Sequence, residues 1–464
     1  MLPSSPSDPP PAMAKHTASP KSHSRQSSSL CSCFLSDCSV FTGGAMAALL
    51  FVWALWTVCN SLNPAIINLS SSSSSSYLRA DSLPTHQHKP SPFPSDSPGS
   101  TFYDDPSLDY TIGVPMKDWD RKRSEWMASH PWITPRKIIL VTGSQPTACK
   151  NPTGDHLLLR FFKNKADYCR LHGYDIFYNN VLLQPKMHTF WAKLPAVKSV
   201  MISHPETEWV WWVDSDAAIT DMEFTLPLER YVGRNLIVHG WENMVYENRS
   251  WVGLNAGVFL MRNCQWSMDF MEVWASMGPQ TPDYAEWGRI QTSVLADRMF
   301  KNADDQSGLV YLLLKEKEKW GDKIFLENSF YFESYWIEIV GKLEDVSKKY
   351  EEMERADAAL RRRHAEKTSE LYWPKREAHL REEGYGPNSL RRPFITHFTG
   401  CQPCSGDHNK MYSGENCYKG MVRVLNFADN QVLKNYGFYR KDLLDTETVF
   451  PAPFDFPANR SGSA

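Results

Sequence analysis

Two carboxylates one residue apart, Asp214 and Asp216, follow the apolar run Trp209–Val213. Side chains alternate along a strand, so both acids are expected to point at one spot. That spot lies at the carboxyl end of a buried strand, where open α/β sheets bind their ligands. Two carboxylates this close repel each other unless a cation lies between them, and hard divalent cations take oxygen ligands from carboxylates and substrate phosphates. The pair predicts a metal site that holds a diphosphate; the alternative is an ordinary solvated turn.

A second acidic group, Asp304-Asp305-Gln306, precedes the apolar run Leu309–Leu312, which is typical of a helix. The simple interpretation is helix capping and helix-dipole stabilisation, which contributes about 0.5–2 kcal/mol. Asp304 alone can supply the cap. Asp305 and Gln306 are then expected to face the reacting centre.

The elements that must position these groups alternate along the chain. Apolar runs predict strands at 137–143, 174–178, 209–213, 235–239 and 256–260, and helical periodicity predicts helices at 155–171, 192–204 and 266–274. Alternating strands and helices imply an α/β fold, with a mostly parallel sheet covered by helices on both faces. Lys193, at the start of the second of these helices, either reaches a phosphate or is solvated.

Composition sets limits on the protein class. The 464 residues carry a formal net charge of −3, which gives no indication of a nucleic-acid partner, and they suffice for one large or two medium domains. The 17 tryptophans are explained mainly by core packing. The alternative for some of them is stacking on the C–H faces of sugars.

The N-terminal third differs from the rest. Residues 38–59 form 22 residues without a charge, enough to span roughly 30 Å of hydrocarbon as a helix. A cleaved signal peptide is the alternative, but its apolar region would be shorter and closer to Met1. Basic residues precede the span, so we expect a single-pass type II protein with its N-terminus in the cytosol. The following segment is rich in serine and proline and is expected to be a tether.

The predicted organisation follows from these shifts in composition. It comprises a disordered cytosolic tail (1–37), a transmembrane anchor (38–59), a disordered lumenal stem (60–110), a catalytic domain (111–458) with a charged, solvated helical insertion (335–390), and a short tail (459–464). Glycosylation sequons occur at Asn68, Asn248 and Asn459. Six cysteines follow the anchor, and their even number in an oxidising compartment favours disulfides over zinc binding or free thiols. Their connectivity stays open.

Runs of residues over roughly 105–445 together resemble a known family. They are Val141–Pro146, Gly154–His156, Asp167–Arg170, Trp211–Asp216, Leu254–Gly257, Arg262–Trp266, Asp304–Gln306, His397–Cys401 and Asn426–Gln431. The family is plant glycosyltransferase family 34, the α-1,6-galactosyl- and α-1,6-xylosyltransferases of hemicellulose synthesis. The resemblance implies a GT-A (Rossmann-like) fold, a type II Golgi membrane anchor, a UDP-sugar donor, Mn²⁺ dependence and retention of anomeric configuration.

The resemblance also implies roles for single residues. Asp216 is expected to bind the metal directly, Asp214 to bind it through water or to hold the ribose, and His397 to be the third ligand. The expected donor and nucleotide contacts are Thr142, Gly143, Ser144, Asp214, Ser215, Asn255, Gly257 and Gly400. The expected acceptor platforms are Trp241 and Trp251, with core packing as the alternative for each. The catalytic group comprises Asp304, Asp305 and Gln306.

Three features favour the galactomannan galactosyltransferase branch of the family. Gln402 stands where the xylosyltransferases typically carry Lys, and the run Ser405–Asn409 and the long charged insertion are the other two features. We expect transfer of galactose to a β-1,4-linked mannan, by a front-face route or by double displacement with Asp305 as nucleophile. The alternatives are an α-1,6-xylosyltransferase of xyloglucan synthesis, an inactive lumenal scaffold and, less favoured, a metal-dependent hydrolase. Homo- or hetero-oligomers with other wall-polysaccharide enzymes are expected partners.

Overall fold

The computed structural model describes residues 100–357, 360, 369–384 and 391–452. The predicted anchor at 38–59, the cytosolic tail, most of the stem and the sequons at Asn68 and Asn459 lie outside the described residues. Within the described segments, no helix combines the length and the apolar character needed to span a bilayer.

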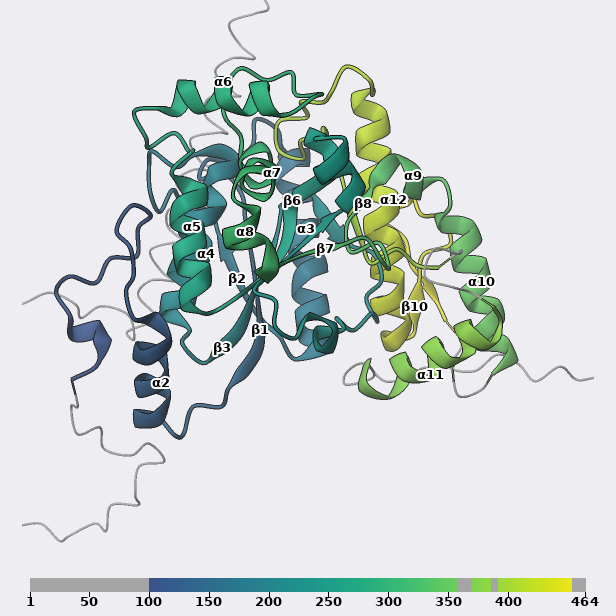
Figure 1. Cartoon of the computed structure of the whole chain (residues 1–464). Helices are drawn as coiled ribbons and strands as arrows, with labels where there is room; N and C mark the ends of the chain where they lie inside the picture. Colours follow the sequence, from purple (N-terminus) through teal and green to yellow (C-terminus); the bar gives the residue numbers. More distant parts are fainter. Residues whose placement is uncertain (1–99, 358–359, 361–368, 385–390, 453–464) are drawn as a thin grey trace, which may run out of the picture. The chain divides into compact units, whose positions relative to one another are not determined.

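A six-stranded sheet forms the centre of the described fold (Figure 1). In spatial order its strands are β2 (Asp175–Asn179), β1 (Arg136–Gly143), β3 (Thr207–Val213), β6 (Leu254–Arg262), β5 (Leu236–Gly240) and β7 (Ile324–Glu327). The pairs β1–β2, β1–β3 and β5–β7 are parallel, whereas β6 runs antiparallel to both of its neighbours. The predicted parallel-rich α/β sheet is confirmed, with β6 as the exception.

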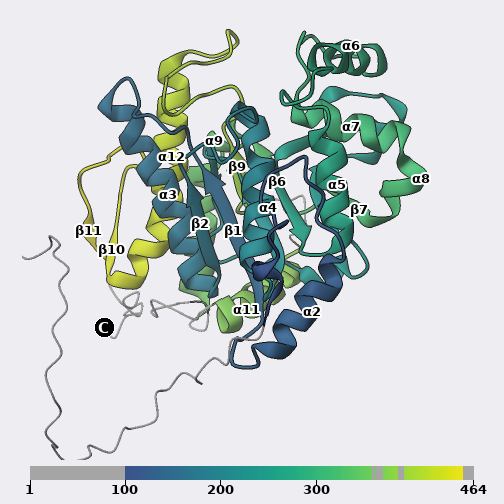
Figure 2. The ribbon, with the colours of Figure 1, turned by 90° about the vertical axis from the view of Figure 1, so that its left-hand side faces the viewer.

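Helices cover both faces of this sheet, as Figure 2 shows edge-on. Alternate residues of each strand enter different cores: Ile139 packs on one side and Ile138 on the other. The first core includes residues of α4 (Lys193–Ser203), α5 (Gln265–Ala275) and α7 (Asp305–Lys315). The second includes residues of α3 (Pro152–His172) and α12 (Gly414–Leu433). The predicted covering of both faces is confirmed.

A small second sheet lies beside the end of β3. Its strands, in spatial order, are β4 (Ala217–Ile219), β9 (Ile395–His397) and β8 (Ser334–Tyr335). β4 and β9 are antiparallel, with Ala217 opposite His397. This pairing brings His397 beside Asp216, even though the two residues are far apart in sequence.

The charged segment 335–390 is less solvated than the sequence predicts. It contains α9 (Trp336–Val340), α10 (Leu343–Ala356) and α11 (Ser369–Glu382). α10 buries Leu343, Val346, Tyr350 and Met353 at helical spacing. The helix therefore has one apolar face, although most of its residues are charged. Arg376 of α11 is 1% exposed and pairs with Asp221 at 2.6 Å and Glu223 at 2.9 Å. These helices are therefore packed on the catalytic fold through a buried face and a buried ion network.

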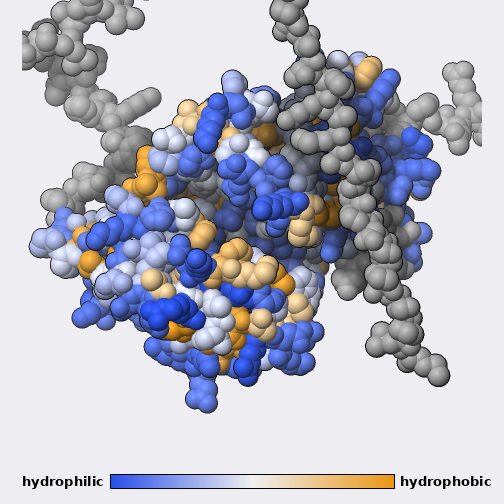
Figure 3. Space-filling view, turned by 90° about the horizontal axis from the view of Figure 1, so that it is seen from above, coloured by the Kyte–Doolittle hydropathy of each residue, from blue (hydrophilic) through white to orange (hydrophobic). Residues whose placement is uncertain are grey.

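The ordered fold also begins before the predicted end of the stem at residue 110. The 3-10 helix η1 (Phe102–Asp104) places the Phe102 ring against Trp119 at 5.2 Å, at the start of α2 (Trp119–Ser129). The other α-helices and strands of the described residues are α6 (Tyr284–Val294), α8 (Lys317–Trp320), β10 (Phe438–Tyr439) and β11 (Phe450–Pro451). On the one face that Figure 3 shows, the described residues are mostly hydrophilic, with apolar residues in groups among them.

Candidate metal and donor site

Three predicted metal ligands meet at the end of β3. The candidate ligand atoms of Asp214, Asp216 and His397 all lie within 4.8 Å of one another. His397 Nε2 is 3.2 Å from Asp216 Oδ1 and 3.9 Å from Asp214 Oδ2. Two carboxylates and one imidazole are a donor set that suits a divalent transition metal such as Mn²⁺. The residues therefore fit the expected cation.

A glycine makes room for this cluster. Gly257 lies on β6, and a Cβ added to it would lie 2.4 Å from His397 Cε1 and 2.7 Å from Asp214 Oδ2. Its carbonyl oxygen accepts a hydrogen bond from the Asp214 amide at 2.8 Å. The backbone at the end of the run Leu254–Gly257 thus passes close to the ligands, and any side chain at Gly257 would displace them.

The imidazole of His397 lies between two acids. Its Nδ1 is 3.2 Å from Glu333 Oε1, on the side of the ring opposite Asp216. Burial by itself would lower the pKa of His397, but Asp216 and Glu333 raise the pKa to about 10. A cation that binds Nε2 must therefore displace a proton, so its affinity is expected to increase with pH.

Of the three residues predicted to be catalytic, Asp304 caps a helix and Asp305 lies beside a buried lysine. Asp304 is the N-cap of α7: it accepts hydrogen bonds from the Ser307 amide at 2.8 Å and from Arg298 at 2.9 Å. Asp305 instead pairs with Lys193, whose Nζ is 2.7 Å from its Oδ2. Burial raises the pKa of Asp305 to about 6, and Lys193 opposes that shift.

Lys193 is buried, and its ammonium group has ion-pair and hydrogen-bond partners. Its side chain is 3% exposed, and its Nζ lies 3.5 Å from Asp214 Oδ1 and donates to the Ala256 carbonyl at 2.9 Å. It therefore bridges Asp305 to the metal-site carboxylate Asp214. Trp212 fixes the same oxygen, because its indole N–H donates to Asp214 Oδ1 at 2.6 Å.

A second buried lysine stands near the same carboxylates. Lys165 of α3 is 1% exposed, and its Nζ lies 5.4 Å from the centre of the Phe161 ring. Burial lowers the pKa of Lys165 to about 7, although Asp216 and Asp214 oppose that shift. Its helix is held to β4 by Asn164, which bonds both the N–H and the C=O of Ile219.

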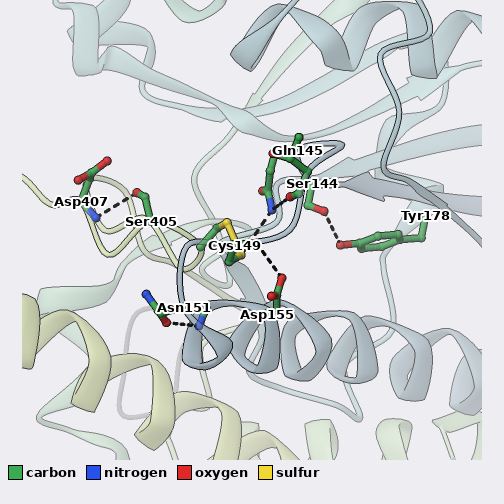
Figure 4. Close-up of a disulfide and its surroundings, with 11 residues drawn as sticks. Ser144, Gln145, Cys149, Asn151, Asp155, Tyr178, Ser405 and Asp407 are labelled. Atoms are coloured by element: carbon green, nitrogen blue, oxygen red, sulfur yellow. Dashed lines mark hydrogen bonds between the residues drawn. A yellow bond between two sulfur atoms is a disulfide. The ribbon is translucent and has the colours of Figure 1, made fainter.

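The expected nucleotide contacts lie at the end of β1. A Cβ on Gly143 would lie 2.2 Å from the Asn179 carbonyl oxygen, so this glycine is required by the neighbouring strand β2. The hydroxyl of Thr142 is buried without a hydrogen-bond partner in the described structure. Tyr178 donates to the Ser144 hydroxyl at 2.8 Å, as Figure 4 shows. The backbone and hydroxyls of this loop remain candidates for the nucleotide.

A disulfide ties this loop to the loop after His397. Cys149 is bonded to Cys404 across 255 residues, and the Cys149 amide donates to Asp155 at 3.1 Å (Figure 4). Gly154 lets the linked segments approach, because a Cβ there would lie 2.4 Å from the Cys404 carbonyl oxygen. A second disulfide joins Cys401 to Cys417. The prediction of disulfides is confirmed for four of the six cysteines; Cys169 and Cys264 are free.

The remaining predicted residues surround the cluster less closely. Gln306 accepts from the Ala256 amide at 3.3 Å and donates to the Trp251 carbonyl at 3.0 Å. Asn255 accepts from the Gly257 amide at 2.8 Å. The side chain of Trp251 is half-buried, and its N–H donates to Asp304 at 3.2 Å, which favours a structural role for this ring.

Four more predicted residues are placed by the structure. Trp241 is 41% exposed and packs edge-on against His239 at 4.5 Å, so its ring remains available to an acceptor. Ser215 is half-buried between the two acids. Gly400 has φ +81°, a conformation that favours glycine in the turn after His397. Asn248 is exposed, as a glycan acceptor must be.

Comparisons with known proteins identify relatives of this chain. Residues 134–408 match the model of the galactosyl transferase GMA12/MNN10 family, glycosyltransferase family 34. The chain is 53% identical to galactomannan galactosyltransferase 1 of Cyamopsis tetragonoloba over 92% of this chain and 97% of that protein. It is 54% identical to putative glycosyltransferase 7 of Arabidopsis thaliana, over 91% of this chain and 93% of that protein.

More distant matches complete the comparison. Probable xyloglucan 6-xylosyltransferase 1 of Oryza sativa subsp. indica is 46% identical over 72% of this chain and 68% of that protein. The solved structure of a glycosyltransferase involved in glycosylating the major capsid of PBCV-1 covers 61% of this chain and 98% of its own, with 10% identity and a TM-score of 0.33. The family match and the two relatives above 50% identity, together with the assembled carboxylate–histidine cluster, lead to one conclusion: the chain is a glycosyltransferase and belongs to family 34, with its greater similarity to the galactomannan branch.

Proposed function

We propose that this glycosyltransferase transfers galactose from UDP-galactose, in α-1,6 linkage, to a β-1,4-linked mannan backbone, with Mn²⁺ bound by Asp214, Asp216 and His397. The observation that carries the proposal is the joint presence of this cluster and of 53% identity to a galactomannan galactosyltransferase. The proposal includes a GT-A fold and a single-pass type II location in the Golgi membrane, with the catalytic domain in the lumen.

The proposed chemistry assigns a task to the cation and to the buried pair of Asp305 and Lys193. When bound, a divalent cation neutralises charge on the departing diphosphate and acts as a Lewis acid. Asp305 is buried beside Lys193 and, ionised, stabilises the positive charge that develops at the anomeric carbon. Lys193 keeps Asp305 and Asp214 at a fixed separation by pairing with both. The buried setting strengthens each of these interactions.

Retention of configuration is consistent with a double displacement and with a front-face route, and we favour the front-face route because it needs no nucleophile from the protein. The acceptor hydroxyl then attacks from the side on which the diphosphate leaves, and a departing phosphate oxygen takes its proton. A double displacement would instead require Asp305 as nucleophile, and its contact with Lys193 is better suited to a stabilising carboxylate than to an attacking one.

The test uses the full-length chain with UDP-galactose, UDP-xylose and UDP-glucose, each offered to manno- and cello-oligosaccharides. We expect Mn²⁺-dependent transfer of galactose to mannose residues and an α-1,6 linkage by NMR. The matched variants are Asp216→Asn, expected to lose transfer, and the exposed Asp407→Asn, expected to retain it. Full activity of Asp216→Asn would refute the metal assignment.

A second candidate is α-1,6-xylosyl transfer to a glucan, favoured by the 46% identity to a probable xyloglucan xylosyltransferase. The two donors differ by one hydroxymethyl group, which changes discrimination by only about 1–3 kcal/mol. Transfer of xylose to cello-oligosaccharides in the same assay would support this candidate over galactosyl transfer. Absence of donor turnover under all conditions would favour a catalytically inactive scaffold.

A further inference from the structure

Glu333 is a buried acid that contacts two histidines. It is 6% exposed; its Oε1 lies 3.2 Å from His397 Nδ1, and its Oε2 lies 3.6 Å from His239 Nε2. Among the described residues, no lysine or arginine forms an ion pair with it. A buried carboxylate is costly unless it is hydrogen-bonded, so its position beside these rings requires an explanation.

The backbone that delivers Glu333 is strained. Phe330 and Tyr331 have φ values of +47° and +53°, which are rare for residues other than glycine. Local strain of this kind persists only where the surrounding structure imposes it, and it occurs frequently at functional sites.

Tertiary contacts hold the strained turn. The Phe330 ring stacks on Phe224 at 4.7 Å, and Phe332 is fully buried. The Tyr331 carbonyl accepts from the Ile395 amide at 3.1 Å. These contacts fix the direction from which the chain enters β8.

Strand pairing then sets Glu333 against His397. β8 and β9 are parallel, with Ser334 opposite Thr396 and Tyr335 opposite His397. Glu333 immediately precedes this pairing, so its side chain reaches the ring of His397 from the side away from Asp216. Its carboxylate therefore meets Nδ1, whereas Nε2 is left to the metal-site acids.

We propose that Glu333 is a positioning residue for cation binding, because it accepts the Nδ1–H of His397 and so presents the Nε2 lone pair to the space shared with Asp214 and Asp216. An imidazole can bind a metal through either nitrogen, and the hydrogen bond made by one selects the other. A carboxylate in this position also increases the basicity of the ligand. The inference rests on one part of the proposed function, namely that the cluster of Asp214, Asp216 and His397 holds a divalent cation.

The same acid links the metal ligand to the expected acceptor platform Trp241. Its second oxygen faces His239, whose ring packs against Trp241. Burial lowers the pKa of His239, which keeps this imidazole neutral near neutral pH. Loss of Glu333 is therefore expected to release both rings.

The experiment measures Mn²⁺ affinity of the purified full-length chain by the loss of the free-ion EPR signal, with and without UDP. We expect Glu333→Ala to raise the Kd for Mn²⁺ by about 10–100-fold, as is typical for loss of such a partner. Glu333→Gln keeps an oxygen that can accept the Nδ1–H, so its Kd is expected to lie between those of wild type and Glu333→Ala.

Two further variants make the result specific. Glu327→Gln removes the charge of another buried acid, which accepts from the Tyr231 hydroxyl at 2.8 Å, and it should leave Mn²⁺ affinity unchanged. His397→Ala should weaken Mn²⁺ binding at least as much as Glu333→Ala. Thermal unfolding of each variant confirms that it is folded, and Glu333→Gln decides the outcome if Glu333→Ala does not fold.

These measurements distinguish a wrong positioning role for Glu333 from a wrong cation site. If His397→Ala weakens Mn²⁺ binding while both Glu333 variants bind as wild type does, the positioning role is wrong and the cation site stands. If His397→Ala also binds Mn²⁺ as wild type does, the cation site itself is wrong. An equal loss of affinity in Glu327→Gln and Glu333→Gln would show a general effect of removing buried charge and would overturn the inference.

Discussion

The substitution Gly257→Ala tests the assembled site with one methyl group. The added Cβ would lie 2.4 Å from His397 Cε1, whereas carbon atoms pack best about 3.5–4.0 Å apart, so the ring must move by about 1 Å or more. Misplacing a catalytic group by about 1 Å can cost about 100-fold in rate. We therefore expect kcat/KM to fall by at least about 100-fold and Mn²⁺ affinity to fall with it. Overpacking of this kind typically costs about 1–3 kcal/mol of stability, so the variant should still fold.

The assay measures sugar transfer, Mn²⁺ binding and thermal unfolding on one preparation. Gly341→Ala is the matched control, because a Cβ added at Gly341 meets no atom within 4 Å. It should leave all three measurements close to wild type. Wild-type transfer and Mn²⁺ binding by folded Gly257→Ala would refute the geometry of the cluster, because no room exists for the methyl group in the described arrangement.

Three other predictions separate the buried charges and the disulfide. Asp304→Ala should lower stability by about 3–5 kcal/mol, since it leaves the buried Arg298 without its carboxylate partner. Asp305→Asn should lose transfer with a smaller loss of stability, because the amide oxygen can still accept from Lys193 and Asp214 stays 3.5 Å from that lysine. Burial lowers the pKa of Lys165 from 10.5 to about 7. The charged form of Lys165 therefore destabilises the fold most at low pH, and this destabilisation decreases as the pH rises above about 7. Lys165→Met should have a higher Tm than wild type at about pH 7, and the difference should be smaller at about pH 9. Cys149→Ser should lower stability by about 2–5 kcal/mol and weaken UDP binding in calorimetry, because the loop after β1 is released.

The sequence predicted the elements whose signals are local. The apolar run before Asp214 indicated β3, and alternation along that strand predicted a paired acid site at its end. The same reasoning gave the capping role of Asp304, which the structure confirms through its bonds to Ser307 and Arg298. Joining His397 to the acids required the family resemblance, because the pairing of β4 with β9 is a long-range contact without a local pattern.

Other parts of the site could not be predicted because their signals are not local. Cys149 and Cys404 are 255 residues apart, and six cysteines allow many pairings. Glu333 follows an irregular turn with positive φ values, where neither strand nor helix periodicity indicates the direction of a side chain. Lys193 was expected to be a phosphate contact or solvated; the solvated alternative is wrong, because two acids hold the lysine inside the protein.

The balance of buried charge is itself an argument for a divalent ion. The acids at the site are Asp214, Asp216, Asp305 and Glu333, and the nearby lysines are Lys165 and Lys193. With neutral imidazoles, the two lysines can offset at most two of the four carboxylates, because the lowered pKa of Lys165, about 7, leaves it only partly charged near neutral pH. At least two negative charges therefore remain in a poorly solvated region, which is unfavourable. Protonation of His397 offsets one of them, as its raised pKa indicates. A divalent cation would replace that proton and offset two of them, and it would leave the site ready to receive a diphosphate whose own charge needs the same ion.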